Sequence, residues 1–297
     1  MSLDGDLAIQ IVPVAGALGA EIRGVDLRVL DEATFDIVHR ALVEHEVVFF
    51  RDVHLTDDEH LALGGRFGTV NIFPTAKLRG ATAPTLQVIV DGPDSKPVAD
   101  YWHTDVTWIA TPPDIAILRP TVIPARGGDT LWASMTTAFD ALSPTMQTML
   151  RGLTVRHDNT SFIRGMLEKL PEQDVPGGLP DLLRANYPPV EHPLVRTHPV
   201  SGRQVLYLGG DFMRGIVGMH PDESDALLTF LRNHMADARF VCRWRWHLGD
   251  VAIWDERSTN HRSAGDHWPQ RREVRRCELG AAVPTYDPHA IAWPRAV

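Results

Sequence analysis

Short apolar runs separated by turn residues are the main pattern of this chain. Residues 8–27 hold two apolar bursts around glycines, which predicts two strands joined by tight turns. Residues 47–50 are continuously apolar, as in a strand that is buried on both faces. The same pattern predicts further short strands at 86–90, 115–118, 130–132, 194–195, 205–208, 240–246 and 251–254. Strands this short, with prolines and glycines between them, favour a sandwich or barrel over a parallel βαβ sheet.

Helical patterns flank these strands. Asp31 is placed to cap a helix with one apolar stripe, and a second helix begins near Thr56 and ends at Gly68. A serine–proline pair at 143–144 predicts another helix start, because proline suits the first helical position. A fourth helix is predicted at 224–235. The chain therefore has a mostly β pattern with flanking helices.

The apolar pattern lapses from residue 159 to residue 191. This stretch is rich in proline, glycine and charge, and it is long for a loop in a compact domain. Loops of this length are usually lids, binding loops or disordered segments, so we predict a lid loop that orders over bound substrate. No Gly/Ser linker, charge run or repeat divides the chain, which predicts one domain over residues 1–297.

Composition narrows the classes of partner. The 297 residues are 44% hydrophobic, enough for a large core, and the formal net charge is −9. This charge argues against nucleic acid and anionic membranes, which require a basic excess, and favours a small-molecule partner. The N-terminus lacks a signal-peptide pattern, no apolar run reaches the ~18 residues of a membrane span, and Cys242 and Cys277 are the only cysteines. We therefore expect a reduced, cytoplasmic protein that forms a homo-oligomer.

Candidate chemistry centres on His103 and Asp105. They are two residues apart within apolar, strand-like surroundings, and residues i and i+2 of a strand share a face. His261 lies far downstream, shortly after the strand predicted at 251–254. Two histidines and one carboxylate form the facial triad of non-haem Fe(II) oxygenases, which leaves further coordination positions for cosubstrate and O2.

The same spacing recurs at His220 and Asp222, which shows that spacing alone is weak evidence for a metal site. There the pair opens the helical pattern at 224–235, so Asp222 or Ser224 is predicted to cap a helix. The remaining histidines have no partner at ligand spacing, and we interpret them as structural.

Seven ordered blocks carry a wider resemblance. They are Gly19–Leu27, Val47–Arg51, Arg66–Gly68, Trp102–Thr107, Gly127–Trp132, His192–Pro199 and His261–Arg276. Over about residues 10–282 the sequence resembles the taurine dioxygenase family of iron(II)/2-oxoglutarate-dependent dioxygenases. The resemblance implies a double-stranded β-helix, or jelly roll, with flanking helices. It also implies Fe(II), with 2-oxoglutarate and O2 as cosubstrates.

Position by position, the resemblance makes His103, Asp105 and His261 the iron ligands. Thr130 matches the residue that contacts the 2-oxoglutarate carboxylate, and Arg272 matches the arginine that pairs with its far carboxylate. A guanidinium suits that role, because it is always charged and binds a carboxylate through two prongs.

Arg272 lies in a basic run, 271–276, of a kind that by itself usually faces water. If the run is a core strand, Arg272, Val274 and Arg276 share one face, and two inward arginines beside a metal site imply two anions. One anion is 2-oxoglutarate. We expect Arg276, which matches the arginine that holds the sulfonate in taurine-specific members, to bind the anionic head of the substrate, since an unpaired buried arginine is costly.

Aromatic contacts of the taurine-specific members match Phe162 and Phe212. Phe73, Ala76 and Ala99 stand where those members place a His, a Tyr and an Asn. A pocket that loses three polar groups and gains a phenyl ring favours an anion with a more apolar body, with Phe73 among its contacts. We therefore expect an alkyl sulfonate, an alkyl sulfate, or an aryloxy or alkyl carboxylate rather than taurine.

Two other classes of protein use the same three metal ligands. One is a metal-dependent hydrolase of the zinc type, and the other is a non-catalytic jelly-roll binding protein whose metal is structural. A hydrolase has no use for the 2-oxoglutarate contacts at Thr130 and Arg272, and structural sites usually fill all their metal positions. The residues therefore favour a dioxygenase that hydroxylates a small anionic substrate and releases succinate and CO2.

Overall fold

The computed structural model describes residues 8–169 and 178–294. Its strands are β1 (Gln10–Pro13), β2 (Ala20–Arg23), β3 (Val47–Phe50), β4 (Gln87–Asp91), β5 (Ile115–Val122), β6 (Thr130–Ser134), β7 (Thr154–His157), β8 (Val190–Pro193), β9 (Val195–Thr197), β10 (Gln204–Leu206), β11 (Met213–Ile216), β12 (Val241–Trp244), β13 (Val251–Asp255), β14 (Thr259–Ser263) and β15 (Arg272–Leu279). Its α-helices are α1 (Glu32–His45), α2 (Asp57–Phe67), α3 (Pro74–Leu78), α4 (Met135–Asp140), α5 (Pro144–Leu150), α6 (Thr160–Lys169), α7 (Leu179–Asn186) and α8 (Pro221–Met235).

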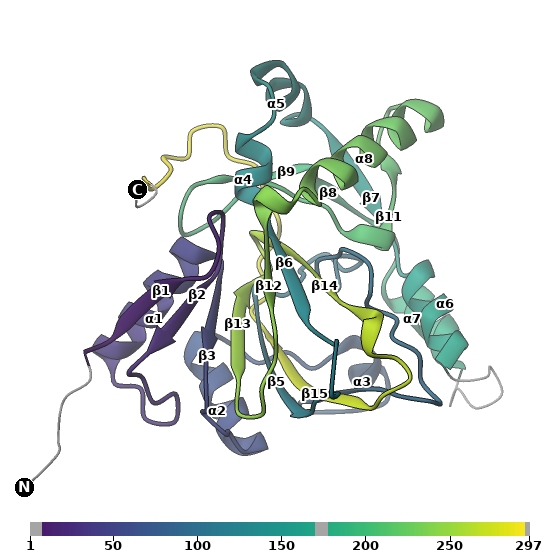
Figure 1. Ribbon diagram of the computed structural model, residues 1–297. Helices are drawn as coiled ribbons and strands as arrows, with labels where there is room; N and C mark the ends of the chain where they lie inside the picture. The colour runs from purple at the N-terminus through teal and green to yellow at the C-terminus, as the bar shows by residue number, and fades with distance from the viewer. Residues whose placement is uncertain (1–7, 170–177, 295–297) are drawn as a thin grey trace, which may run out of the picture.

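Two sheets face each other around the centre of the molecule (Figure 1). The larger has seven strands in the order β1-β2-β3-β13-β5-β15-β4, and the smaller has the order β12-β6-β14. Between them, Phe49 of β3 stacks on Trp244 of β12 with ring centroids 4.0 Å apart. Trp132 of β6 packs against the Phe49 ring in an edge-to-face arrangement. The buried aromatic layer holds the sheets together, and the prediction of a mostly β fold with flanking helices is confirmed.

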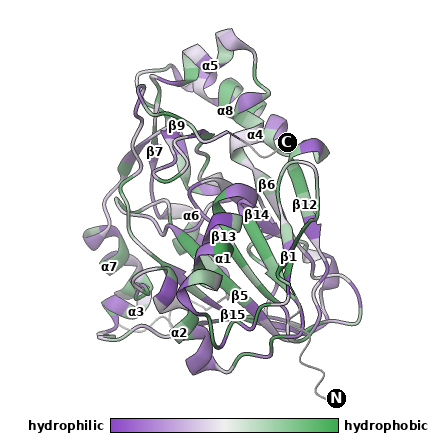
Figure 2. Ribbon diagram, turned by 90° about the vertical axis from the view of Figure 1, so that its left-hand side faces the viewer, coloured by the Kyte–Doolittle hydropathy of each residue, from purple (hydrophilic) through white to green (hydrophobic). Residues whose placement is uncertain are grey.

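Helices α1 and α2 cover the outer face of the large sheet (Figure 2). Val48 and Phe50 of β3 pack in this outer layer with Leu42 of α1, whereas Val47 and Phe49 pack in the layer between the sheets. Alternate residues of β3 thus enter two different cores. This explains why its sequence is continuously apolar, as predicted for a strand buried on both faces.

A third layer of packing joins α4, α5 and α8 to the smaller sheets β11-β7-β8 and β10-β9 (Figure 1). Leu150 of α5, Leu228 and Leu231 of α8, Val155 of β7 and Leu206 of β10 share one buried cluster. The Leu208 carbonyl of this region accepts hydrogen bonds from the side chains of Thr104 and Asn260, each of which directly adjoins a candidate metal ligand in sequence.

Three of the predicted helix starts are confirmed. Asp31, Thr56 and Ser143 each accept a hydrogen bond from a backbone N–H in the first turn of α1, α2 and α5. The predicted cap of α8 is wrong, because His220 itself is the cap and the helix begins at the next residue, Pro221. Imidazole is an unusual helix cap, whereas Asp and Ser are common ones, so the sequence favoured Asp222 or Ser224.

The prediction of an irregular loop at 159–191 is wrong for most of the described part, where α6, α7 and β8 occupy the stretch. Ile163 of α6 and Leu179 and Leu183 of α7 are buried against Trp108 and Phe212. These helices are stabilised by tertiary burial, which a local pattern broken by proline and glycine does not reveal. Residues 170–177 lie outside the described residues, and closure of a lid stays a prediction.

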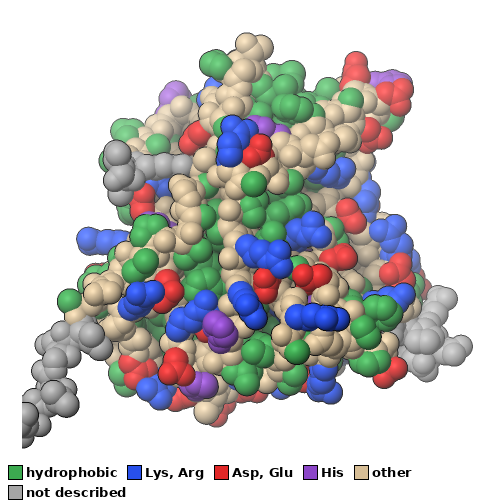
Figure 3. Space-filling view, viewed as in Figure 1, with side chains coloured by type: hydrophobic (Ala, Val, Ile, Leu, Met, Phe, Trp, Pro, Cys, Tyr) green, Lys and Arg blue, Asp and Glu red, His purple; other side chains and the backbone are tan. Residues whose placement is uncertain are grey.

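The surface shows no single sign of charge on the face in Figure 3, where basic and acidic side chains are interspersed. Among the helices of the described residues, none has both the length and the apolar content that crossing a membrane requires.

Candidate metal centre

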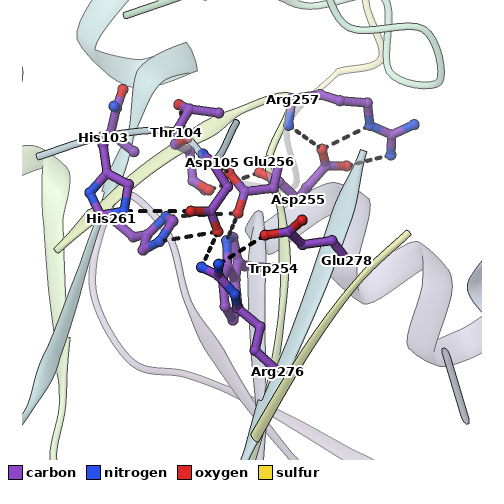
Figure 4. A network of polar contacts seen from close by, with 12 residues as sticks. His103, Thr104, Asp105, Trp254, Asp255, Glu256, Arg257, His261, Arg276 and Glu278 are labelled. Atoms are coloured by element: carbon purple, nitrogen blue, oxygen red, sulfur yellow. Dashed lines mark hydrogen bonds and ion pairs between the residues drawn. The ribbon is translucent and has the colours of Figure 1, made fainter. Parts of the chain in front are cut away.

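The structure brings His103, Asp105 and His261 together in a buried group (Figure 4). One ligand atom from each residue lies within 4.8 Å of the others. Nε2 of His103 is 3.6 Å from Oδ1 of Asp105, and Nε2 of His261 is 3.7 Å from Oδ2. In the part of the chain that the structure describes, no other three His, Cys, Asp or Glu side chains converge in this way.

Backbone pairing places the two histidines opposite each other. The His103 N–H donates to the His261 carbonyl at 3.0 Å, and the His261 N–H donates to the His103 carbonyl at 2.8 Å. Nδ1 of His103 lies 2.8 Å from the Tyr101 carbonyl, which can only accept, so this nitrogen carries the proton. The lone pair of Nε2 is therefore available to bind a metal ion.

Asp105 reaches the group from a turn, so the predicted strand is wrong beyond His103. Residues 105–108 form the turn, and Val106 adopts a left-handed backbone with φ 53°. The turn is held from behind, because Thr107 contacts Nδ1 of His157 at 3.0 Å and its carbonyl accepts from Nε2 of His192 at 2.9 Å. Both histidines are buried and structural, as interpreted from the sequence.

Glu256 is a buried carboxylate beside two ligands, and sequence reasoning missed it (Figure 4). The Asp105 N–H donates to its Oε2 at 3.1 Å, the Trp254 Nε1–H donates to its Oε1 at 2.6 Å, and Nδ1 of His261 lies 3.8 Å away. Burial has the largest effect on Glu256 and the negative charge of Asp105 adds to it, so the pKa of Glu256 lies well above its ordinary value. The one signal in the sequence is an acid placed five residues before His261.

Asp255 anchors the segment between β13 and β14 that leads to His261. Its carboxylate accepts from Arg257 Nε at 2.8 Å and from His198 Nε2 at 2.9 Å. Burial alone would raise the pKa of Asp255, but the Arg257 guanidinium and His198 outweigh it and hold the pKa below its ordinary value. The stability that this ionised group contributes is therefore present above about pH 4 and is lost as the pH falls.

Replacing Asp255 with asparagine should lower the free energy of unfolding by about 3 kcal/mol or more, because it leaves a buried arginine without its charge partner. Urea denaturation at neutral pH measures the change. Asp237→Asn is the matched control, since Asp237 and Arg239 have the same spacing in sequence but form an exposed pair. Equal losses in the two variants would contradict this account of the segment.

Thr130 of β6 and Arg272 of β15 lie side by side on facing sheets. Nη2 of Arg272 is 3.5 Å from Oγ1 of Thr130, and Nε donates to the Gly128 carbonyl at 3.0 Å. Arg272 is buried, and Oδ2 of Asp91 lies 3.8 Å from its Nη1. Gly128 has φ 75°, and a Cβ there would come within 2.9 Å of Pro124, so glycine is required for this approach.

Arg276 lies on the same face of β15, as its spacing from Arg272 predicts, but it already has partners. Nη1 donates to Asp105, and Nη2 lies 2.9 Å from Oε1 of both Gln87 and Glu278 (Figure 4). Arg276 is therefore not left unpaired in the structure, contrary to the premise of the expectation drawn from the sequence, and its binding of a substrate anion stays a prediction. Glu278 is two residues farther along the strand, so the same period of two brings it to this face.

The predicted aromatic contacts also converge. Phe73, Phe162 and Phe212 share one apolar cluster with Val106 and Trp108, next to the turn that holds Asp105. The ring centroids of Phe73 and Phe162 are 5.9 Å apart, and those of Trp108 and Phe162 are 5.3 Å apart. The cluster forms an apolar wall near the candidate metal centre.

A mostly β fold with a buried two-histidine, one-carboxylate group defines the class of the non-haem iron oxygenases. The chain belongs to the family described as "Taurine catabolism dioxygenase TauD, TfdA family", which matches residues 10–278. This family consists of Fe(II)/2-oxoglutarate-dependent oxygenases, so the chain is a dioxygenase, and the hydrolase and non-catalytic hypotheses are set aside.

Known relatives agree with this assignment along most of the chain. The chain is 37% identical to the alpha-ketoglutarate-dependent sulfate ester dioxygenase of Pseudomonas putida over 280 residues, 94% of this chain and 91% of that protein. It is 35% identical to the alkylsulfatase of Acinetobacter baylyi over 281 residues, 93% of this chain and 86% of that protein. The crystal structure of a taurine dioxygenase from Burkholderia xenovorans matches with a TM-score of 0.78 at 33% identity, covering 96% of this chain and 94% of that one.

Proposed function

We propose that this dioxygenase hydroxylates a small anionic substrate with an apolar body, and that alkyl sulfates are the first class to test. The observation that carries the proposal is the inner face of β15, where Arg272 lies beside Thr130 and Arg276 lies beside Asp105. In this proposal Arg272 would bind the cosubstrate and Arg276 would bind the anionic head of the substrate. We also infer that the two facing sheets form the double-stranded β-helix of the family.

The residues fit iron as the resident metal. The three donors are buried, His103 presents a lone pair at Nε2, and two imidazoles with one carboxylate are the donor set that non-haem Fe(II) prefers. His103, Asp105 and His261 would hold the Fe(II), which would supply the activation of O2. Other groups of the protein would hold these ligands in position: the Tyr101 carbonyl accepts from His103, and the Glu256 carboxylate accepts from the Asp105 N–H.

The residues also fit 2-oxoglutarate as the cosubstrate. Arg272 and Thr130 would hold the carboxylate of 2-oxoglutarate that is far from the metal, through a charge-assisted pair and a hydroxyl hydrogen bond. Burial has the largest effect on Arg272 and lowers its pKa from the ordinary value, whereas the nearby carboxylates of Asp91 and Asp129 oppose this shift. An arginine stays protonated at neutral pH even so, and a buried cation of this kind binds a carboxylate strongly.

The substrate class rests on the apolar wall and on the relatives. The Pseudomonas putida relative acts on sulfate esters by its name, and Phe73, Phe162 and Phe212 form an apolar wall in this chain. Such a wall favours an alkyl chain over the amine of taurine. Apolar anions should exceed taurine in kcat/KM by at least about tenfold, roughly the discrimination of one or two buried methylenes.

The oxidation of a primary alkyl sulfate requires no reactant other than O2 and 2-oxoglutarate. One oxygen atom of O2 enters the substrate as a hydroxyl group on the carbon that bears the ester oxygen, and the other enters succinate as CO2 leaves 2-oxoglutarate. The bond between the hydroxylated carbon and the ester oxygen then breaks. The hydroxyl proton passes to the departing sulfate, so the products are an aldehyde and hydrogen sulfate. The apolar wall, by excluding water, would confine this oxidation to the bound substrate.

A succinate-release screen tests the substrate class. Taurine, medium-chain alkyl sulfonates, alkyl sulfates and aryloxyalkanoates would be compared as primary substrates at equal 2-oxoglutarate. We expect alkyl sulfates or sulfonates to give the highest kcat/KM. If taurine is the best substrate, the proposed pocket is wrong even though the reaction class stands.

Replacing Arg276 with glutamine should raise KM for the alkyl sulfate by at least about tenfold, because the anionic head loses a charge-assisted partner. KM for 2-oxoglutarate should change little, since Arg272 still holds it. Steady-state kinetics with each substrate varied in turn separates the two effects. Arg271→Gln is the matched control, because Arg271 is exposed and pairs with Glu273, and an unchanged substrate KM in Arg276→Gln would contradict the role of Arg276.

A further inference from the structure

Glu278 forms a buried ion pair with Arg276 beside the metal ligands (Figure 4). Its Oε1 lies 2.9 Å from Nη2 of Arg276, and Gln87 accepts from the same nitrogen at 2.9 Å. Nη1 donates to Asp105. Protein groups thus occupy both terminal nitrogens of the guanidinium, and in the described residues Nε has no hydrogen-bond acceptor.

Glu278 also lines a cavity of about 570 Å³, a volume typical of small-molecule sites. The cavity lies between α3, the end of α7 and the turn that carries Asp105. Its wall is largely apolar and includes Ile72, Val106, Ile109 and Tyr187. Val106 directly follows Asp105, and Glu278 contacts Arg276, so the cavity adjoins two residues that neighbour the candidate metal centre.

The charges around Arg276 oppose a further anion. Asp105 and Glu278 each contact the guanidinium. These side chains are buried, so solvent and salt screen them weakly. An incoming sulfate meets a guanidinium whose charge is already balanced, and like charges at close range oppose binding.

We propose that Glu278 is a specificity-determining residue, which weakens the binding of an anionic head at Arg276 so that affinity depends on an apolar body in the adjoining cavity. The inference rests on the proposed function of Arg276 as the site of the anionic head. Each buried methylene adds about fourfold in affinity. Small, strongly hydrated anions such as inorganic sulfate are thereby excluded, while a chain that fills the cavity is retained.

Calorimetric titration of the enzyme loaded with Fe(II) and 2-oxoglutarate, without O2, tests the inference independently of turnover. Inorganic sulfate, ethyl sulfate and octyl sulfate would be titrated well above pH 7, because burial raises the pKa of Glu278 to about 7. Glu278→Gln should bind ethyl sulfate at least about tenfold more tightly than the wild type. In an Arg276→Gln background the same change should have little effect, since the two residues act on one anion.

Glu273→Gln is the matched control, because Glu273 lies on the opposite face of β15 and pairs with Arg271 and Arg275. Unchanged or weaker binding of ethyl sulfate in Glu278→Gln would overturn the proposal and give Glu278 the role of orienting Arg276. The wild type alone provides a second measurement that needs no variant. It should bind octyl sulfate far more tightly than ethyl sulfate or inorganic sulfate, and equal affinities would also overturn the proposal.

The failure of the proposed function would look different. If the wild type releases succinate from 2-oxoglutarate but turns over no alkyl sulfate, the substrate class is wrong. The dissociation constants above would still decide whether Glu278 opposes anions at Arg276. Absence of any 2-oxoglutarate turnover would instead contradict the assignment of the reaction.

Discussion

Replacing His103 with alanine should abolish succinate formation and weaken Fe(II) binding by at least about 100-fold. His103 supplies one of three converging donors, and its backbone also pairs with that of His261. Loss of the outer partners of a metal ligand alone typically costs about 10- to 100-fold in metal affinity, so loss of a ligand should cost more. Metal content after chelator dialysis, and succinate release with iron and ascorbate supplied, measure the two effects.

His220→Ala is the matched control for this variant. His220 and Asp222 have the same spacing as His103 and Asp105, but they are exposed at the start of α8, with Nδ1 and Oδ2 3.8 Å apart. The change removes a helix cap and should leave succinate release nearly unchanged. Near-full turnover of His103→Ala with iron supplied would contradict the metal site.

Replacing Arg272 with glutamine should raise KM for 2-oxoglutarate by at least about 30-fold, which corresponds to about 2 kcal/mol. The buried guanidinium would lose its charge-assisted bond to the cosubstrate, and Thr130 would lose its neighbour. Arg272→Lys should also raise this KM, since an ammonium cannot bind a carboxylate through two prongs. Fe(II) binding without 2-oxoglutarate should stay close to that of the wild type, because Arg272 contacts none of the three ligands in the described structure.

Arg275→Gln is the control for Arg272. Arg275 lies on the opposite face of the same strand, where its Nη1 is 2.7 Å from Oε1 of Glu273. Its loss should leave KM for 2-oxoglutarate unchanged. An unchanged value in Arg272→Gln as well would show that another residue holds the cosubstrate.

The alternation of β15 was readable from the sequence because a strand has a fixed period. The period of two predicts that Arg272 and Arg276 share one face, and the structure puts both there. The same period reaches Glu278, whose contact with Arg276 was not anticipated. A period predicts which residues share a face, but whether a carboxylate there meets a guanidinium depends on side-chain packing.

The ligand set, the mostly β fold and the starts of α1, α2 and α5 could be predicted from residue types, short-range spacing and a resemblance. The three-dimensional structure was needed to show how Asp105 reaches the histidines, since its turn is held by His157 and His192 from other strands. It also decided that Glu256 supports Asp105, a contact across 151 residues, and that α6 and α7 are helical. Such features depend on burial between segments far apart in the chain, and no local pattern records which distant segment will cover them.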